Sequence, residues 1–175
     1  ERWAETNMVS SLSCADEWLR EGTCIISYSD IFYDSSAISL LMESQNELAI
    51  TYDPNWAELW TRRFRNPLDD AETFQLNEAR FVTKIGGNPK TLKEIQGQYM
   101  GLLRFTPKGW EEVTAIRNNL KTTIRDHMDM TGLLQRVIKA GKLNIEAIPY
   151  FDKWGEVDSQ EDLDIYNSQA FMEKK

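Results

Sequence analysis

Residues 24–52, which read CIISYSDIFYDSSAISLLMESQNELAITY, contain the pattern that predicts the fold. Residues 24–28 form a short apolar run of the kind found in buried strands, and residues 47–52 form a second such run. Between the two runs, apolar residues gathered at 38–42 mark a helix. A strand, a helix and a second strand in this order are typical of βαβ units. We therefore predict an α/β domain with a doubly wound, mostly parallel mixed sheet.

The rest of the chain continues the alternation of helices and strands. We predict helices at 8–20, 108–118, 131–140 and 160–167, strands at 73–76, 80–85, 98–105 and 143–149, and an irregular excursion or short helix at 53–70. A doubly wound sheet should begin with a strand and a phosphate-binding turn, whereas this sequence begins close to a helix. We therefore expect residues 1–175 to form a single domain whose sheet is incomplete at the N-terminus.

Composition excludes several classes of function. With 28 acidic and 20 basic residues, the net charge of -8 disfavours broad binding to nucleic acid or to an anionic membrane. No apolar run approaches the ~20 residues of a membrane span, and no secretory signal pattern is present. Cys14 and Cys24 have neither zinc spacing nor a disulfide framework. The simple interpretation is a cytoplasmic protein.

Two acidic residues close predicted strands far apart in the sequence. Asp30 ends the run that begins at Cys24, and Asp158 ends residues 154–158. Ligands of open α/β sheets bind beyond the carboxyl ends of the strands, where two carboxylates can share one hard cation. Mg²⁺ takes one or two carboxylates and fills its other positions with phosphate and water, so the pair predicts a Mg²⁺ site for a triphosphate. The alternatives are an exposed turn residue for Asp30 and a helix N-cap for Asp158.

Five segments resemble one family of enzymes. They are ETNMVSSL (5–12), ISYSDI (26–31), GQYMGL (97–102), DMTGLL (129–134) and WGEVDSQEDL (154–163). Together they resemble the nucleotidyltransferases that activate phosphorylated small molecules, of the sugar-phosphate, phosphocholine and phosphonate type. The resemblance implies a nucleotide-diphospho-sugar transferase-like fold and covers nearly the whole chain. The Gly-x-Gly-x-Arg loop with which such enzymes hold the triphosphate is absent from this sequence, so the resemblance implies the C-terminal portion of such a domain.

The resemblance also implies roles for particular residues on the nucleotide side. Asp30 and Asp158 would hold Mg²⁺ and act in catalysis, with Asp30 also contacting the nucleotide. Asn7, Ser10 and Ser11 would lie under the base, and their pattern favours CTP. The alternative for Asn7 is plain capping of the first helix.

On the acceptor side, the resemblance implies contacts from residues of several segments: Gln98, Tyr99, Gly101, Asp129 and Thr131. For Tyr99 a place in the core is an equal alternative, and for Asp129 and Thr131 the alternative is helix capping. Trp154 would offer a cation–π contact to an amine, or else pack against the sheet. Arg63 would bind a phosphate or phosphonate oxyanion, or else pack against a part of the protein outside this sequence.

Three functions remain open at this point. The first is Mg²⁺-dependent transfer of a nucleotidyl group to a phosphonate or phosphorylated small molecule, with release of pyrophosphate. The second is a related glycosyltransferase, although Asp30 is preceded by Tyr28 and Ser29 and so fits an Asp-x-Asp motif poorly. The third is an inactive fragment that serves assembly. The partners implied are an NTP, the acceptor, and a missing N-terminal segment or second chain, and assembly as a homodimer is left open.

Overall fold

The main sheet is built around two strands that are buried along nearly their whole length. The structure is a computed structural model that describes residues 2–168. Four strands lie in the order β1-β6-β3-β7: β1 (Cys24–Ser27), β6 (Gln98–Phe105), β3 (Leu48–Asp53) and β7 (Ile145–Pro149). Strand β6 is antiparallel to β1 and β3, and β3 is parallel to β7, so that β1, β3 and β7 run in the same direction. The predicted α/β class with a mixed sheet is confirmed.

Hydrophobic cores cover both faces of this sheet. Along β3, Leu48 and Ile50 belong to one cluster of buried residues, and Ala49 belongs to the other. Strand β6 divides in the same way, with Leu103 in the first cluster and Leu102 in the second. Successive side chains of a strand point to opposite faces, so central strands that are apolar at every position need a cover on both sides. This is the pattern from which the fold was predicted.

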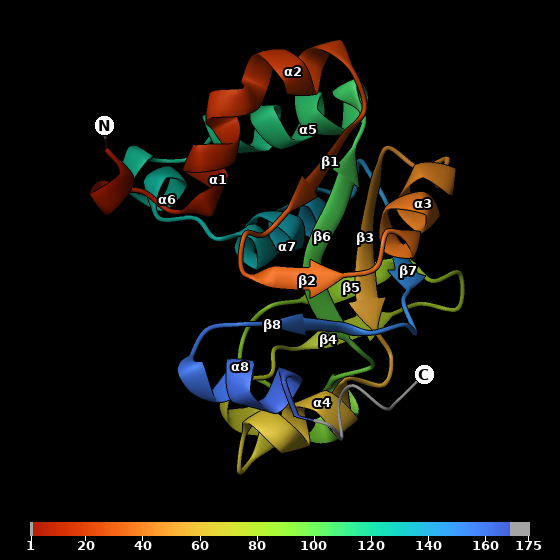
Figure 1. The fold of residues 1–175 in the computed structure, drawn as a ribbon. Coiled ribbons are helices and arrows are strands. Elements are labelled where there is room, and N and C mark those ends of the chain that lie inside the picture. Colours follow the sequence, from red (N-terminus) through yellow and green to blue (C-terminus); the bar gives the residue numbers. More distant parts are fainter. Residues whose placement is uncertain (1, 169–175) are drawn as a thin grey trace.

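The covers are helical on both sides. The helices are α1 (Met8–Leu12), α2 (Asp16–Glu21), α3 (Ser36–Glu43), α4 (Trp56–Arg63), α5 (Pro107–Asn118), α6 (Thr122–Asp126), α7 (Met130–Ala140) and α8 (Gln160–Tyr166), with 3₁₀ turns at Trp3–Glu5, Ser13–Ala15, Pro67–Asp69 and Leu92–Glu94. Buried residues of α1, α2, α5 and α7 join the first core, and those of α3, α4 and α8 join the second. Figure 1 shows α5 and α7 on one side of the main sheet and α3 on the other.

Two short sheets complete the fold. Strands β2 (Ile31–Tyr33) and β8 (Trp154–Glu156) pair antiparallel and form what we call the β2–β8 ribbon. In Figure 1 this ribbon crosses in front of the main sheet. Strands β4 (Phe74–Leu76) and β5 (Val82–Ile85), which correspond to the strands predicted at 73–76 and 80–85, pair antiparallel as a hairpin. The ribbon therefore joins two segments from opposite ends of the sequence.

The predicted single helix at residues 8–20 is wrong, because the structure breaks it into α1, a 3₁₀ turn and α2. The hydroxyl of Ser13 donates to the carbonyl of Val9 at 2.8 Å. Such bonds from serine to the preceding turn compete with regular helix geometry. The break also changes which residues face the core: Leu19 is buried, whereas Trp18 is 70% exposed.

The excursion predicted at residues 53–70 contains a short helix, α4, which was one of the two alternatives. Its buried residues Trp56, Leu59 and Trp60 follow the spacing of one helix face. Among the helices of residues 2–168, none combines the length and apolar character that crossing a bilayer requires.

Candidate functional site

The β2–β8 ribbon brings three carboxylates together. Asp30 lies in the bend between β1 and β2, three residues beyond the end of β1 and not within that strand as predicted. The backbone N–H of Val157 donates to the carbonyl of Asp30 at 2.8 Å, which fixes the two segments against each other. One carboxylate oxygen each from Asp30, Glu156 and Asp158 lies within 4.8 Å of the others. We call these three residues the carboxylate cluster.

Glu156 was not among the residues predicted from the sequence. It precedes Asp158 by two positions, and residues two apart on an extended chain lie on the same face. That spacing is a signal in the sequence that indicates Glu156 once Asp158 has been chosen. Ser159, and not Asp158, is the N-cap of α8, where its side chain accepts from the N–H of Asp162. The capping alternative for Asp158 is therefore wrong, and its carboxylate is available to the cluster.

Arg63 lies beneath the cluster and ties it to α4. Its side chain is 1% exposed and forms ion pairs with Asp162 at 2.7 Å, Asp158 at 2.8 Å and Glu156 at 3.2 Å. The guanidinium also lies over the rings of Trp60 and Phe64, about 5 Å from each centroid. Since Nε and both terminal nitrogens already bind carboxylates, the structure corrects the expected substrate contact. Arg63 positions the cluster.

The electrostatics of the cluster suit a cation. Burial raises the pKa of Glu156, the negative charges of Asp158 and Asp30 raise it further, and Arg63 opposes the rise. Burial would also raise the pKa of Asp162, but hydrogen bonds from Arg63 and Ser159 outweigh it and hold that pKa below its usual value. Arg63 offsets only part of the repulsion among the three carboxylates, and carboxylate oxygens are the ligands that a hard divalent ion prefers.

The separations fit Mg²⁺ after a small movement. Two oxygens on one Mg²⁺ ion lie at most about 4.2 Å apart, twice the Mg–O distance. Asp30 and Asp158 are exposed and can change rotamer, so oxygens within 4.8 Å can reach this separation. The residues present therefore fit the predicted ion, which Asp30, Glu156 and Asp158 would hold.

A cavity of about 540 Å³ contains two of the predicted acceptor residues, Asp129 and Thr131. We call it the Glu72 cavity, and its polar lining consists of Glu72, Lys84, Asp129, Thr131, Gln135 and Lys139. Asp129 also caps α7, accepting from the N–H of Gly132 at 2.7 Å, and the hydroxyl of Thr131 donates to Glu72 at 3.3 Å. Asp129 thus has the capping role that was its alternative, which does not remove its carboxylate from the cavity lining.

Tyr28 connects the Glu72 cavity to the carboxylate cluster electrostatically. Burial raises its pKa most, and the charges of Glu72, Asp129 and Glu156 raise it further. Glu72 and Asp129 line the cavity, whereas Glu156 belongs to the cluster. The charges of both groups therefore act on the Tyr28 hydroxyl.

Three of the predicted acceptor residues, Gln98, Tyr99 and Gly101, lie on β6. Tyr99 is buried in the first core, in edge-to-face contact with Tyr28 at 5.9 Å between centroids. Gln98 pairs with Asp53 at the end of the ladder between β3 and β6. Gly101 was expected to let backbone approach a ligand, but the group that approaches it is the Tyr28 ring. Tyr99 and Gly101 thus position Tyr28.

We expect Gly101→Ala to destabilise the protein by about 2–5 kcal/mol. Gly101 has a φ of 77°, which costs an alanine about 1–2 kcal/mol. A Cβ there would also lie 2.7 Å from the Tyr28 ring, and overpacking of this kind costs about 1–3 kcal/mol. Gly87→Ala is the matched control, because Gly87 has a φ of 78° and nothing within 4 Å of its Cβ position. Urea unfolding of both variants measures the difference, and equal losses would contradict a packing role for Gly101.

Two of the three residues predicted under the base, Asn7 and Ser10, contact the α6 segment. Asn7 caps α1 by accepting from the N–H of Met8 at 2.7 Å, and its backbone N–H donates to the carbonyl of Asp126 at 2.7 Å. The hydroxyl of Ser10 accepts from Arg117 at 3.0 Å, and Ser11 is exposed. The capping alternative for Asn7 is therefore present in the structure. Nucleotide contact by Asn7, Ser10 and Ser11 stays a prediction.

Trp154 lies at the other end of the β2–β8 ribbon, opposite Tyr33 and away from the Asp30 end. Its indole N–H donates to the buried carboxylate of Asp53 at 3.0 Å, and its ring lies 6.1 Å from that of Trp60. It is 4% exposed. The packing alternative therefore describes Trp154 in this structure, and a cation–π contact with an acceptor stays a prediction.

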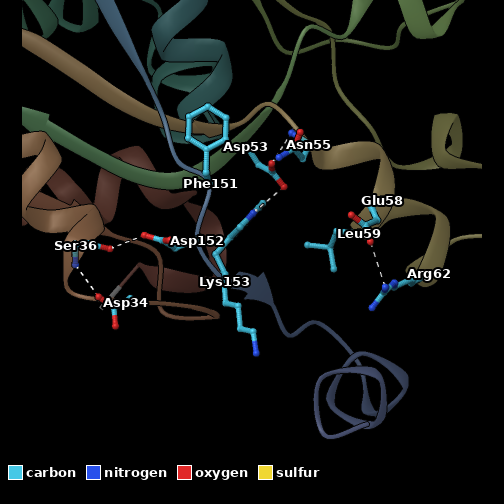
Figure 2. A pocket seen from close by; sticks show the side chains of 11 residues that line it. Asp34, Ser36, Asp53, Asn55, Glu58, Leu59, Arg62, Phe151, Asp152 and Lys153 are labelled. Carbon is cyan, nitrogen blue, oxygen red and sulfur yellow. Dashed lines mark hydrogen bonds and ion pairs between the residues drawn. The ribbon is translucent and has the colours of Figure 1, made fainter. Parts of the chain in front are cut away.

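A larger cavity of about 700 Å³ opens at this end of the ribbon. Figure 2 shows Asp53 and Asn55 at the end of β3, with Glu58, Leu59 and Arg62 on α4 and Phe151 and Lys153 on the β7–β8 connection. It contains no member of the carboxylate cluster, and Trp154 is the one predicted site residue that lines it. Size alone does not make a site, so we place the candidate site at the cluster and the Glu72 cavity.

Comparisons with known proteins identify relatives of the chain as a whole. The chain is similar to the CTP:phosphoglutamine cytidylyltransferase of Campylobacter jejuni subsp. jejuni serotype O:2, with 33% identity over 175 residues, which cover 94% of this chain and 68% of the relative. No protein-family model matches the chain.

Solved structures show the same fold at low identity. One is the inositol-1-phosphate CTP transferase from T. maritima, with a TM-score of 0.71, 17% identity, and coverage of 98% of this chain and 62% of that one. Another is a putative glucose-1-phosphate thymidylyltransferase from Bacillus anthracis in complex with a sucrose, with a TM-score of 0.70, 12% identity, and coverage of 97% and 63%. The chain therefore spans less than two thirds of the length of these solved chains.

Proposed function

This chain belongs to the nucleotidyltransferases of the cytidylyltransferase type, and from that premise we propose that the complete protein transfers a cytidylyl group from CTP to a small molecule. The acceptor is a phosphate or phosphonate, the second product is pyrophosphate, and the reaction depends on Mg²⁺. This proposal favours nucleotidyl transfer over glycosyl transfer, because the relatives named above are nucleotidyltransferases.

One observation carries the proposal: the carboxylate cluster is assembled from two distant segments, with one oxygen of each residue within 4.8 Å of the others. Nucleotidyl transfer brings a triphosphate and a second oxyanion together, and their mutual repulsion must be compensated. A site that gathers carboxylates, with Arg63 as the cation beneath them, is suited to bind such anions only through a metal ion.

In the proposed reaction an oxygen of the acceptor phosphoryl or phosphonyl group attacks the α-phosphorus of CTP. The new oxygen–phosphorus bond forms as the bond from the α-phosphorus to the bridging oxygen of the β-phosphate breaks, and pyrophosphate leaves with that oxygen and its electron pair. Bound Mg²⁺ supplies charge compensation and orientation. The protein needs no covalent intermediate, since positioning and electrostatics provide the catalysis.

Within the chain, each residue has a distinct proposed part. Asp30, Glu156 and Asp158 hold the ion, and Arg63 holds Glu156 and Asp158 in place. Asp129 and Thr131 contact the acceptor in the Glu72 cavity, while Asn7, Ser10 and Ser11 contact the base. A triphosphate-binding loop of the Gly-x-Gly-x-Arg type is not in this sequence, so we propose that a further segment or a second chain supplies it.

A pyrophosphate assay on the complete protein tests the function. CTP and UTP are each combined with an acceptor panel of phosphonates, phosphocholine, phosphorylated amines and sugar 1-phosphates, with Mg²⁺ or with EDTA. We expect pyrophosphate from CTP with at least one acceptor, and none in EDTA. Release of a nucleoside diphosphate in place of pyrophosphate would contradict the proposal, because that product indicates attack at the γ-phosphorus and not at the α-phosphorus.

A further inference from the structure

We propose that the Glu72 cavity receives the non-reacting end of the acceptor, and that Glu72 selects acceptors in which this end carries an ammonium or other N–H cation. This inference deepens the function proposed above and rests on it. Neither the sequence patterns nor the relatives assign a role to Glu72. The position follows from the cavity lining and from the surroundings of its carboxylate.

The Glu72 carboxylate has capacity for further donors. In the described part of the chain, its hydrogen-bond donor is the hydroxyl of Thr131 at 3.3 Å, which is a long bond. An ionised carboxylate accepts about four hydrogen bonds. Its side chain is only partly exposed, so water satisfies the remaining capacity less completely than at a free surface. A ligand that donates N–H groups would fill it.

The charges around Glu72 favour a cation at that point. Burial raises the pKa of Glu72, and the negative charges of Asp129 and Asp70 raise it further, while the bond from Thr131 opposes the rise. Repulsion between Glu72 and Asp129 disfavours an anionic group placed between them. An ammonium ion there would pair with both and restore the ionised state of Glu72.

The opposite charge is also present in the cavity. Lys84 and Lys139 line it, and both are exposed. A cavity with two acidic and two basic residues matches a ligand that carries both signs of charge. An acceptor with an ammonium group near Glu72 and an anionic group near a lysine meets this requirement. A neutral polyol would leave the charges of the two acidic and the two basic residues uncompensated.

The experiment compares acceptors that differ only in the nitrogen. The complete protein is assayed with matched pairs: 2-aminoethylphosphonate against propylphosphonate, phosphoethanolamine against 2-hydroxyethyl phosphate, and O-phosphoserine against 3-phosphoglycerate. For the wild type we expect kcat/KM at least ten times higher for the amine of the preferred pair. In Glu72→Gln this ratio should fall to near one, mainly through a higher KM for the amine, with the KM for CTP unchanged.

Two further variants separate recognition from a structural effect. Glu72→Asp keeps the charge and should restore part of the preference. Glu78→Gln removes an exposed glutamate in the hairpin turn and should leave the preference intact. Thermal unfolding of Glu72→Gln checks that the variant folds, and a merely structural role would lower kcat/KM for both members of each pair alike.

The outcomes distinguish this inference from the function itself. If pyrophosphate is released but amine-free acceptors are used as well as amines, or if Glu72→Gln lowers both equally, the role of Glu72 is refuted and nucleotidyl transfer stands. If no acceptor yields pyrophosphate with CTP, the proposed function fails and the role of Glu72 fails with it.

Discussion

Asp30→Ala should abolish Mg²⁺-dependent nucleotide binding by the complete protein and lower kcat/KM by about 10²–10³-fold. Loss of one ligand from a three-carboxylate site removes a share of the several kcal/mol that a metal ion contributes, and each ~1.4 kcal/mol is a factor of ten. Asp30 is suited to this test because its replacement by alanine should disturb the fold little. Its side chain is exposed, and its bond to Val157 uses the backbone carbonyl, which alanine retains.

Isothermal titration with CTP, with and without Mg²⁺, measures the effect. Asp164→Ala is the matched control, because Asp164 is an exposed aspartate on α8 that lies outside the carboxylate cluster. The control should bind CTP like the wild type. Mg²⁺-dependent binding that survives in Asp30→Ala, or a wild type that binds CTP equally well without the ion, would remove the metal site from the proposal.

Much of the main sheet could be predicted from the sequence. Strand β6 has the bounds predicted for it, 98–105, and β3 differs from its prediction by one residue at each end. Both strands are buried on two faces, so their apolar runs record the tertiary structure directly. The same argument explains the error at residues 8–20. The apolar spacing there indicates helix but carries no information about the serine that interrupts it.

The candidate site was predictable only in part, because it depends on contacts between distant segments. Strands β2 and β8 have three residues each, too few to show an alternating pattern, and their pairing is what brings Asp30 to Glu156. Asp30 and Asp158 were identified because each was predicted to end a strand. Glu72 had no comparable signal, since a side chain that lines a cavity is recognised only after the rest of the lining is known.

Arg63 shows how position in space can change the interpretation of a residue type. An arginine in an irregular, Trp-rich stretch is suited to bind a ligand oxyanion, and that was one of its two predicted roles. In the structure its side chain is almost fully buried, and its three nitrogens bind Glu156, Asp158 and Asp162. Two of these carboxylates belong to the cluster, so Arg63 links the stability of the α4 region to the geometry of the proposed metal site.

We expect Arg63→Met to lower the free energy of unfolding by about 3–5 kcal/mol, the cost of removing one partner from a buried ion pair. Methionine fills much of the space but leaves the buried carboxylate of Asp162 without its cation. Arg62→Met is the matched control: Arg62 pairs with Glu58 at the surface, at helical i,i+4 spacing, and should cost at most about 0.5 kcal/mol. Urea unfolding at neutral pH measures both variants.

The pH dependence of this difference tests its electrostatic origin. The pKa of Asp162 is lowered in the folded wild type, where hydrogen bonds from Arg63 and Ser159 outweigh burial. A lowered pKa gives stability that is present above the unfolded value of about 3.9 and is lost as the pH falls through the folded pKa. The difference in unfolding free energy between wild type and Arg63→Met should therefore decrease below about pH 4. If the difference in unfolding free energy between the two proteins stays constant at acidic pH, Arg63 stabilises the fold by packing on Trp60 and Phe64 and not by charge.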